Sequence, residues 1–182
     1  MANLLFFGTL KVIKLSKGLV QVYTGDGKGK TTAAIGLIIR AHGNQLKTGL
    51  VQFLKGVASG ELATLEKLGI PFWQFGSGEF IMGAPTKKDR ELAQTGLQKV
   101  EEIWQDYDLL VLDEISYLVT CGLLGEEVIC EFIMRKPPHL ELVLTGRSMP
   151  ESILAQADLI TEMKKIRHPY DLGISARKGI EY

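Results

Sequence analysis

A glycine-rich run that carries a lysine and two hydroxyls lies near the start of this 182-residue chain. It reads Thr24-Gly-Asp-Gly-Lys-Gly-Lys-Thr-Thr32. Its glycines, Gly25, Gly27 and Gly29, permit positive φ and let the backbone approach anionic oxygens without a Cβ in the way. Lys30 can neutralise phosphate charge, and the Thr31 hydroxyl is suited to Mg²⁺. The run therefore predicts a cradle for a nucleotide triphosphate.

The segments on either side of the glycine-rich run are of the kind that such a cradle needs. Residues 18–23 are β-branched and aromatic, which is typical of a buried strand, and residues 32–42 are apolar at helical spacing. A strand that turns into a helix here directs backbone N–H groups and the positive end of the helix dipole at one place. The usual pattern begins with glycine, where this chain has Thr24. A chance match is the alternative, but strand, glycines and helix in register favour the nucleotide.

A pair of carboxylates, Asp113 and Glu114, ends a second apolar segment, residues 108–114. In open α/β sheets, ligands bind outside the carboxyl ends of the strands, so both side chains are predicted to face the phosphates. One of them would bind Mg²⁺ directly or through water. The alternative is that the pair only caps a following helix. Together with the cradle, the pair favours the metal.

A further strand-like segment, residues 140–145, is followed by Arg147, and a polar segment near the C-terminus also bears on the site. A guanidinium at this strand end can bind phosphate oxygens bidentately, although a lone arginine is more often a surface or ion-pair residue. The polar segment, residues 164–171, holds one of the three histidines. With its continuation to Gly179, it is predicted to pack on another part of the protein.

Composition limits the classes of function. A hydrophobic content of 46% in 182 residues fits one compact domain, and equal numbers of basic and acidic residues, 21 each, argue against a nucleic-acid partner. Cys121 and Cys130 lie outside any zinc-ligand spacing, so we expect reduced packing residues. Residues 1–8 are too short to span a membrane and lack the features of a leader peptide. We therefore expect a cytoplasmic protein without a membrane partner.

Strand-like and helix-like segments alternate along the chain, which predicts an α/β fold with a mostly parallel central sheet covered on both faces. The predicted strands are 18–23, 48–54, 71–75, 108–114, 140–145 and 159–163. The predicted helices are 32–42, 60–68, 86–104, 125–135 and 150–157. Residues 1–17 are read as an N-terminal extension and residues 18–182 as the single domain.

Six motifs in order resemble those of the ATP:corrinoid adenosyltransferases of the P-loop type, over nearly the whole of residues 18–182. These motifs are Val20-Gln-Val-Tyr-Thr-Gly-Asp-Gly-Lys-Gly-Lys-Thr-Thr32, Val51-Gln-Phe-Leu-Lys-Gly56, Val111-Leu-Asp-Glu114, Leu144-Thr-Gly-Arg147, Ala157-Asp-Leu-Ile-Thr-Glu-Met163, and His168-Pro-Tyr-Asp171 with Lys178-Gly-Ile-Glu-Tyr182. Six motifs in one order are far more specific than a phosphate-binding loop alone.

The resemblance implies a three-layer α/β/α, RecA-like domain that transfers the 5′-deoxyadenosyl group of ATP to the cobalt of a Co(I) corrinoid and releases triphosphate. It implies a catalytic set of Lys30, Thr31, Glu114 and Arg147. The nucleotide-binding positions would be Gly25, Asp26, Gly27, Lys28, Gly29, Lys30, Thr31 and Thr32, and Mg²⁺ would be held by Thr31 with Asp113 or Glu114. It also implies a homodimer and a reductase that supplies Co(I).

Two segments depart from the family pattern. Residues 1–17 are short and largely apolar, where relatives often carry a polar helix that covers the corrinoid. Residues 76–85 lack the family's Phe-x-Trp pair, so Phe80 is expected to take the aromatic role against the corrin, while Trp73 and Phe75 are read mainly as sheet core. The alternative functions are a P-loop ATPase or small-molecule kinase, and a nucleotide-binding regulatory module.

Overall fold

The computed structural model describes residues 15–78, 81 and 83–181, and its centre is a six-stranded parallel sheet. The strand order is β3-β2-β4-β5-β1-β6. The strands are β1 (Val20–Thr24), β2 (Thr48–Phe53), β3 (Phe72–Phe75), β4 (Leu109–Asp113), β5 (Glu141–Thr145) and β6 (Leu159–Glu162). Every pairing between neighbouring strands is parallel, which confirms the predicted fold class.

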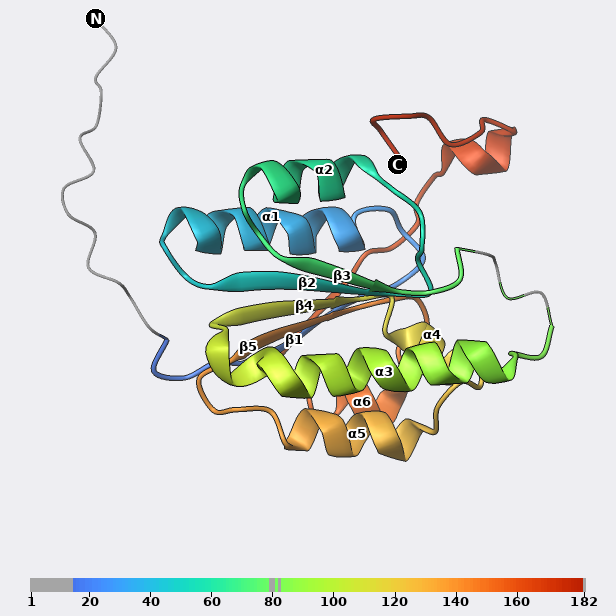
Figure 1. Cartoon of the computed structure of the whole chain (residues 1–182). Coiled ribbons are helices and arrows are strands. Elements are labelled where there is room, and N and C mark those ends of the chain that lie inside the picture. The colour runs from blue at the N-terminus through green and yellow to red at the C-terminus, as the bar shows by residue number, and fades with distance from the viewer. Residues whose placement is uncertain (1–14, 79–80, 82, 182) are drawn as a thin grey trace, which may run out of the picture.

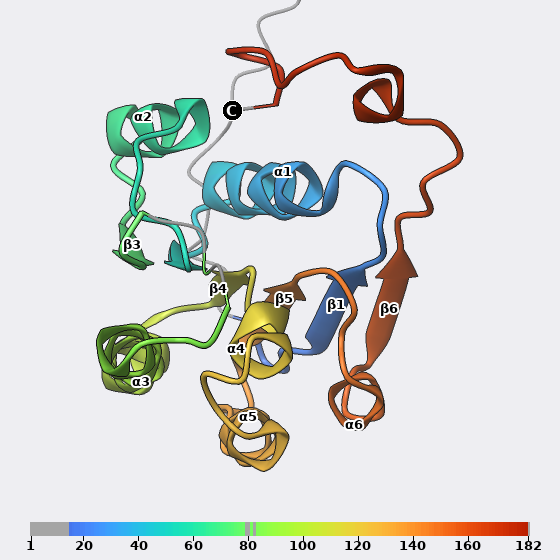
Figure 2. The ribbon, with the colours of Figure 1, turned by 90° about the vertical axis from the view of Figure 1, so that its right-hand side faces the viewer.

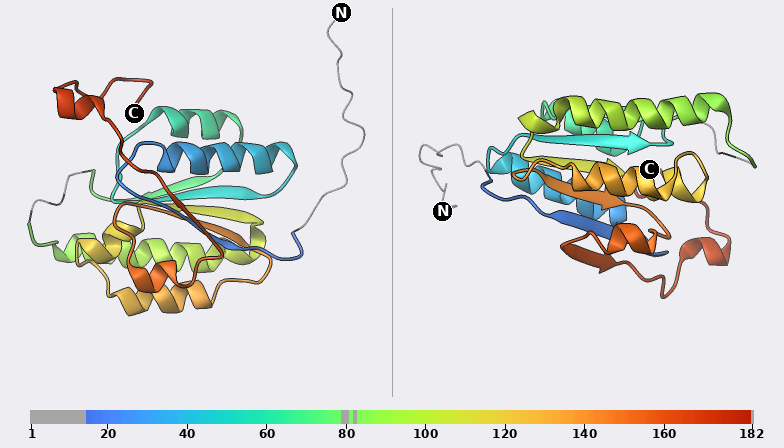
Figure 3. Two further views of the ribbon diagram at one scale, coloured as in Figure 1. Left: turned by 180° about the vertical axis from the view of Figure 1, so that it is seen from behind. Right: turned by 90° about the horizontal axis from the view of Figure 1, so that it is seen from below.

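Helices cover both faces of the sheet and make the three layers (Figures 1 and 2). The helices are α1 (Lys30–Gly43), α2 (Gly60–Lys67), α3 (Lys87–Ile103), α4 (Ser116–Thr120), α5 (Glu126–Met134) and α6 (Glu151–Leu154), with 3₁₀ turns η1 (Trp104–Asp106) and η2 (Pro169–Leu172). One face carries α1, α2 and the C-terminal segment, and the other carries α3 to α6. Views from behind and from below show the same division (Figure 3).

Each face of the sheet has its own hydrophobic core, and β4 contributes to both. Successive side chains of a strand point to opposite faces. Leu110 and Leu112 accordingly belong to the core under α3 and α5, whereas Leu109 and Val111 belong to the core under α1 and α2. This arrangement explains why the segment reads as a continuous apolar run rather than an alternating one.

Helix α3 is fixed at its start by a cap and along its length by close packing. The Thr86 hydroxyl accepts from the backbone N–H of Asp89, and the Asp89 carboxylate accepts from the backbone N–H of Thr86, which forms a capping box. A Cβ on Gly96 would lie 2.5 Å from the Phe53 ring, so the helix sits directly on the sheet. Trp73 and Phe75 pack against this core, as the sequence predicted.

Two segments differ from the sequence expectation or extend it. The five-residue helix α4 was not predicted, because one helical turn is too short to show a periodic pattern. After β6, residues 163–181 leave the sheet and cross to the side of α1 (Figure 2).

Both cysteines are free thiols. None of the helices within the described part of the chain is long and apolar enough to span a membrane.

Candidate active site

The carboxyl ends of β1, β2, β4 and β5 meet at one edge of the sheet and surround a cavity of about 600 Å³. The structure brings most of the predicted site residues to this cavity. Its lining includes Gly27, Lys28, Gly29, Lys30, Thr31, Thr32, Glu114 and Arg147. Asp26 and Arg147 line an adjoining cavity of about 620 Å³ beneath the C-terminal segment. Asp113 is fully buried behind the cavity wall.

Glycine is required at positions 25 and 29 of the cradle for a different structural reason than at position 27. Gly25 and Gly29 have φ values of 96° and 122°, in the region that favours glycine, and α1 begins directly after Gly29. Gly27 lies outside that region and is needed for a close approach instead. Its N–H donates to the Met163 carbonyl at 2.5 Å, and a Cβ would lie 2.5 Å from the same oxygen. The loop is therefore fitted against the end of β6.

Lys30 is folded back onto the loop that precedes it. Its ammonium donates to the carbonyl oxygens of Gly25 at 2.6 Å and Gly27 at 2.8 Å. Burial lowers the pKa of Lys30, and the nearby guanidinium of Arg147 lowers it further. The side chain thus closes the turn of the loop and at the same time lines the cavity.

Asp113 is the best-bonded carboxylate of the site. One oxygen accepts from the hydroxyls of Thr31 at 2.8 Å and Thr145 at 2.6 Å. The other accepts from the Gln52 amide at 3.0 Å and the Lys55 ammonium at 2.6 Å. A carboxylate has about four acceptor positions, so these donors fill it. Asp113 therefore orients Thr31 and Lys55 from behind the wall.

Glu114 has the opposite environment, although it is the next residue. Its backbone turns to φ 62°, and its N–H donates to the Thr145 hydroxyl at 3.1 Å. Its Oε2 is buried without a hydrogen-bond partner among the described residues. Burial raises the pKa of Glu114, and the neighbouring Asp113 charge raises it further. A buried carboxylate oxygen that lacks a donor within the described chain, on a residue lining the same cavity as Thr31, is suited to a hard cation.

Lys55 is a residue of the site that the sequence reasoning did not single out. It follows β2 at the same edge of the sheet as the other functional residues and lines the main cavity. Burial alone would lower the pKa of Lys55, but the ion pair with Asp113 outweighs this and raises it. The rule that found Asp113 and Arg147, polar residues just after a buried strand, would also have found Lys55.

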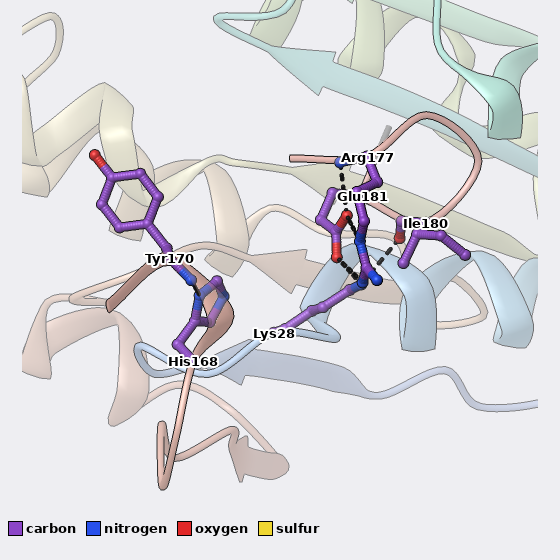
Figure 4. Close-up of polar contacts among 6 residues, drawn as sticks. All are labelled: Lys28, His168, Tyr170, Arg177, Ile180 and Glu181. Carbon is purple, nitrogen blue, oxygen red and sulfur yellow. Dashed lines mark hydrogen bonds and ion pairs between the residues drawn. The ribbon is translucent and has the colours of Figure 1, made fainter. Parts of the chain in front are cut away.

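The C-terminal segment contacts the cradle, as its predicted packing requires (Figure 4). The Lys28 ammonium donates to the Ile180 carbonyl at 2.9 Å and to the Glu181 carboxylate at 3.0 Å. Glu181 also accepts from the backbone and the guanidinium of Arg177. The hydrogen bonds from Arg177 and Lys28 lower the pKa of Glu181 to about 2. Arg147 and His168 line both cavities, which therefore meet under this segment.

Two expectations fall outside the described part of the chain. Phe80, predicted to face the corrin, and most of the N-terminal extension, residues 1–14, belong to the segments for which no placement is described. Their predicted roles stay predictions. Of the loop around Phe80, Ile81 is described and packs against the core beneath α3.

Comparison with known proteins agrees with the arrangement of the site. The family described as "ATP:corrinoid adenosyltransferase BtuR/CobO/CobP" matches residues 16–182. A corrinoid adenosyltransferase of Escherichia coli K12 is 33% identical over 176 residues, covering 91% of this chain and 86% of that protein. Its counterpart in Salmonella typhimurium is 34% identical over 169 residues, with the same coverage. One from a Sinorhizobium species is 35% identical over 173 residues, covering 91% of this chain and 81% of its own.

Proposed function

The chain belongs to the ATP:corrinoid adenosyltransferase family, and from this premise we propose how its residues carry out the reaction. It is an enzyme that uses ATP to transfer an adenosyl group to a corrinoid. In the reaction that we propose, the electron pair of Co(I) attacks C5′ of ATP. The cobalt–carbon bond forms, the bond from C5′ to the α-phosphate oxygen breaks, and its electrons leave with triphosphate.

The protein's main task in such a reaction is to stabilise the leaving group. Negative charge grows on triphosphate as the C5′–O bond breaks, and preorganised cations and N–H donors stabilise that charge without rearranging. The observation that carries the proposal is the cluster of Lys28, Lys30, Lys55 and Arg147 around one cavity at the N-terminus of α1. Lys30 would move from the loop carbonyls to the phosphates, while the start of α1 adds its dipole.

Mg²⁺ fits the residues that are present. Thr31 would supply a hydroxyl ligand and Glu114 the buried oxygen that has no partner in the described part of the chain, while Asp113 orients Thr31 through the 2.8 Å hydrogen bond. A magnesium ion bound there would neutralise phosphate charge and lower the energy of the departing triphosphate. Since Asp113 already accepts four hydrogen bonds, we assign it the supporting role rather than that of a direct ligand.

Family membership disfavours the alternatives raised by the sequence, γ-phosphoryl transfer by an ATPase or kinase and a regulatory module without turnover. The family resemblance supports a homodimer and a reductase that delivers Co(I), and these stay predictions. The cytoplasmic location is likewise a prediction from the sequence.

The test is anaerobic incubation of the purified protein with ATP, Mg²⁺ and chemically reduced cob(I)alamin. We expect the alkylcobalamin spectrum together with one triphosphate for each cobalamin that reacts. ADP or orthophosphate with an unchanged corrinoid spectrum would contradict the proposal and support phosphoryl transfer. The same mixture without protein is the control for chemical alkylation.

A further inference from the structure

Lys55 is held at the wall of the cavity by a turn with little freedom. Leu54, just before it, has a φ of 56°, and its N–H donates to the Phe75 carbonyl at 2.9 Å. A left-handed conformation is costly for a residue with a branched side chain and persists only where its surroundings fix it.

Two glycines lock this turn in place. A Cβ on Gly76 would lie 2.5 Å from the Leu54 backbone, and one on Gly56 would lie 2.7 Å from the Gly76 carbonyl oxygen. The turn after β2 and the turn after β3 are therefore in direct backbone contact. Backbone strain of this kind is common at functional sites, and here the strained turn fixes the position of the Lys55 ammonium.

The ammonium of Lys55 shares a carboxylate with Thr31. Asp113 accepts from Thr31 on one oxygen and from Lys55 on the other, at 2.8 Å and 2.6 Å. An ammonium has three donors, and this carboxylate takes one of them. The Lys55 side chain is 30% exposed whereas that of Asp113 is fully buried, and the exposed part of Lys55 lines the cavity that also contains Lys30 and Glu114.

From this geometry, and on the basis of the proposed function, we propose that Lys55 binds the triphosphate group directly. Asp113 acts as its positioning residue, fixing the ammonium on one side and the Thr31 hydroxyl on the other. Lys30 then approaches the phosphates from the β1 side of the cavity and Lys55 from the β2 side. Two lysines on opposite walls would bind the long leaving group along its length.

A purely structural role for Lys55 makes a different prediction. If the ammonium only neutralises the buried Asp113 charge, a neutral residue at position 113 removes the need for it. The two roles therefore separate in a background that carries Asp113→Asn. A comparison within that background also avoids leaving a buried carboxylate unpaired, which would destabilise the single Lys55→Met variant.

The experiment measures binding of inorganic triphosphate by calorimetry without divalent metal, using D113N and the double variant K55M/D113N. We expect the double variant to bind about tenfold or more weakly than D113N, the usual effect of losing one charge-assisted hydrogen bond. Lys67→Met in the D113N background is the matched control, since Lys67 is an exposed lysine at the end of α2, and it should change binding by less than about twofold. Lys55→Arg should retain most of the binding, because a guanidinium also donates to phosphate.

Equal affinities of D113N and K55M/D113N for triphosphate would overturn the proposal. The assay of adenosyl transfer is independent of this measurement. If the wild-type protein forms no alkylcobalamin but the double variant loses triphosphate binding, the proposed function fails while the role of Lys55 stands. If transfer occurs and the two variants bind equally, the function stands and the role of Lys55 fails.

Discussion

Asp113 and Glu114 are adjacent in the sequence, yet the structure gives them opposite tasks. Glu114 has a left-handed φ, and the donors that bond Asp113 make no hydrogen bond to the Oε2 of Glu114. One carboxylate is filled by hydrogen bonds, whereas the other keeps a buried oxygen without a partner among the described residues. Leaving such an oxygen unpaired costs roughly 1–3 kcal/mol, and a bound cation would recover this cost.

Lys30→Ala should lower kcat/KM for adenosyl transfer by about two orders of magnitude, as removal of one preorganised charge donor typically does. The Lys30 ammonium is already held at the cradle by the Gly25 and Gly27 carbonyls, so it is in place to bind phosphate. Initial rates of alkylcobalamin formation measure the effect, with Lys67→Ala as a control that should behave as the wild type. A rate for Lys30→Ala within twofold of wild type would rule out the phosphate role.

Glu114→Gln should have opposite effects on metal use and on stability. The Mg²⁺ concentration for half-maximal activity should rise by about tenfold or more, because an ionised ligand is lost. The melting temperature without metal should rise at pH 7. Burial raises the pKa of Glu114, so its charged form opposes folding, and wild-type stability falls as pH rises through the interval above 4.5.

Thermal unfolding at two pH values checks the stability effect of this variant. Near pH 4 the carboxyl is mostly protonated in both the folded and unfolded states, and the difference between the two melting temperatures should become small. A melting difference that is the same at pH 4 and pH 7 would contradict the raised pKa of Glu114.

The Mg²⁺ titration tests the metal role of Glu114 separately. If Glu114→Gln leaves the Mg²⁺ concentration for half-maximal activity unchanged, Asp113 rather than Glu114 is the metal ligand.

Secondary-structure elements position these side chains, and their types followed from the sequence because the strands are apolar runs and the longer helices show helical spacing. All six strands and five of the six helices were predicted, with ends that differ by a few residues. The helix α4 and the ion pair of Lys55 with Asp113 were not predicted. Helix α4 is too short to show a periodic pattern, and the ion pair joins residues far apart in sequence, about which local periodicity carries no information.

Gly27→Ala should separate the cradle from the end of β6. The added Cβ would lie 2.5 Å from the Met163 carbonyl oxygen, and backbone cannot move aside as a flexible side chain can. We expect a loss of about 1–3 kcal/mol in unfolding free energy and weaker ATP binding. Gly36→Ala is the control, because its Cβ would meet nothing within 4 Å inside α1 and should stabilise by about 0.5–1 kcal/mol. Equal stability of the two variants would contradict the fit described for the loop.

Glu181, which joins the C-terminal segment to Lys28, should titrate at an unusually low pH. With a pKa of about 2, Glu181 remains charged well below the ordinary value of 4.5. A depressed carboxyl pKa contributes stability that is complete above 4.5 and is lost as pH falls through about 2. Carboxyl resonances followed by NMR should show this midpoint in the wild type and a higher one in Arg177→Gln, still below 4.5 because Lys28 and the backbone N–H of residue 177 continue to donate to Glu181. An unchanged midpoint in the variant would exclude the Arg177 contact as the cause.

At the scale of the whole molecule, one sheet serves two cores. Leu50 and Leu112 are both fully buried, the first in the core under α1 and α2 and the second in the core under α3 and α5. The two residues lie on neighbouring strands, β2 and β4. A substitution that destabilises the core on one face should therefore also destabilise the core on the other, because the two cores share the hydrogen-bonded strands of one sheet.

Leu50→Ala and Leu112→Ala should each cost about 2–5 kcal/mol, the usual penalty for truncating a buried leucine. Because the two cores share their strands, each variant should still unfold in one cooperative transition. Urea unfolding followed by fluorescence and by circular dichroism tests this. Transitions that do not coincide between the two probes would show that the faces unfold separately.

The position of β1 in the sheet also has a consequence for synthesis on the ribosome. Both of its neighbours come late in the chain, since Val20 pairs with Leu142 in β5 and Gln21 with Leu159 in β6. A nascent chain that ends before β5 offers β1 no native partner strand, and pairings across so long a separation form slowly. The nucleotide loop is thus among the first segments translated and among the last to acquire its native setting, so a chain stalled early in translation would display the motif without the site.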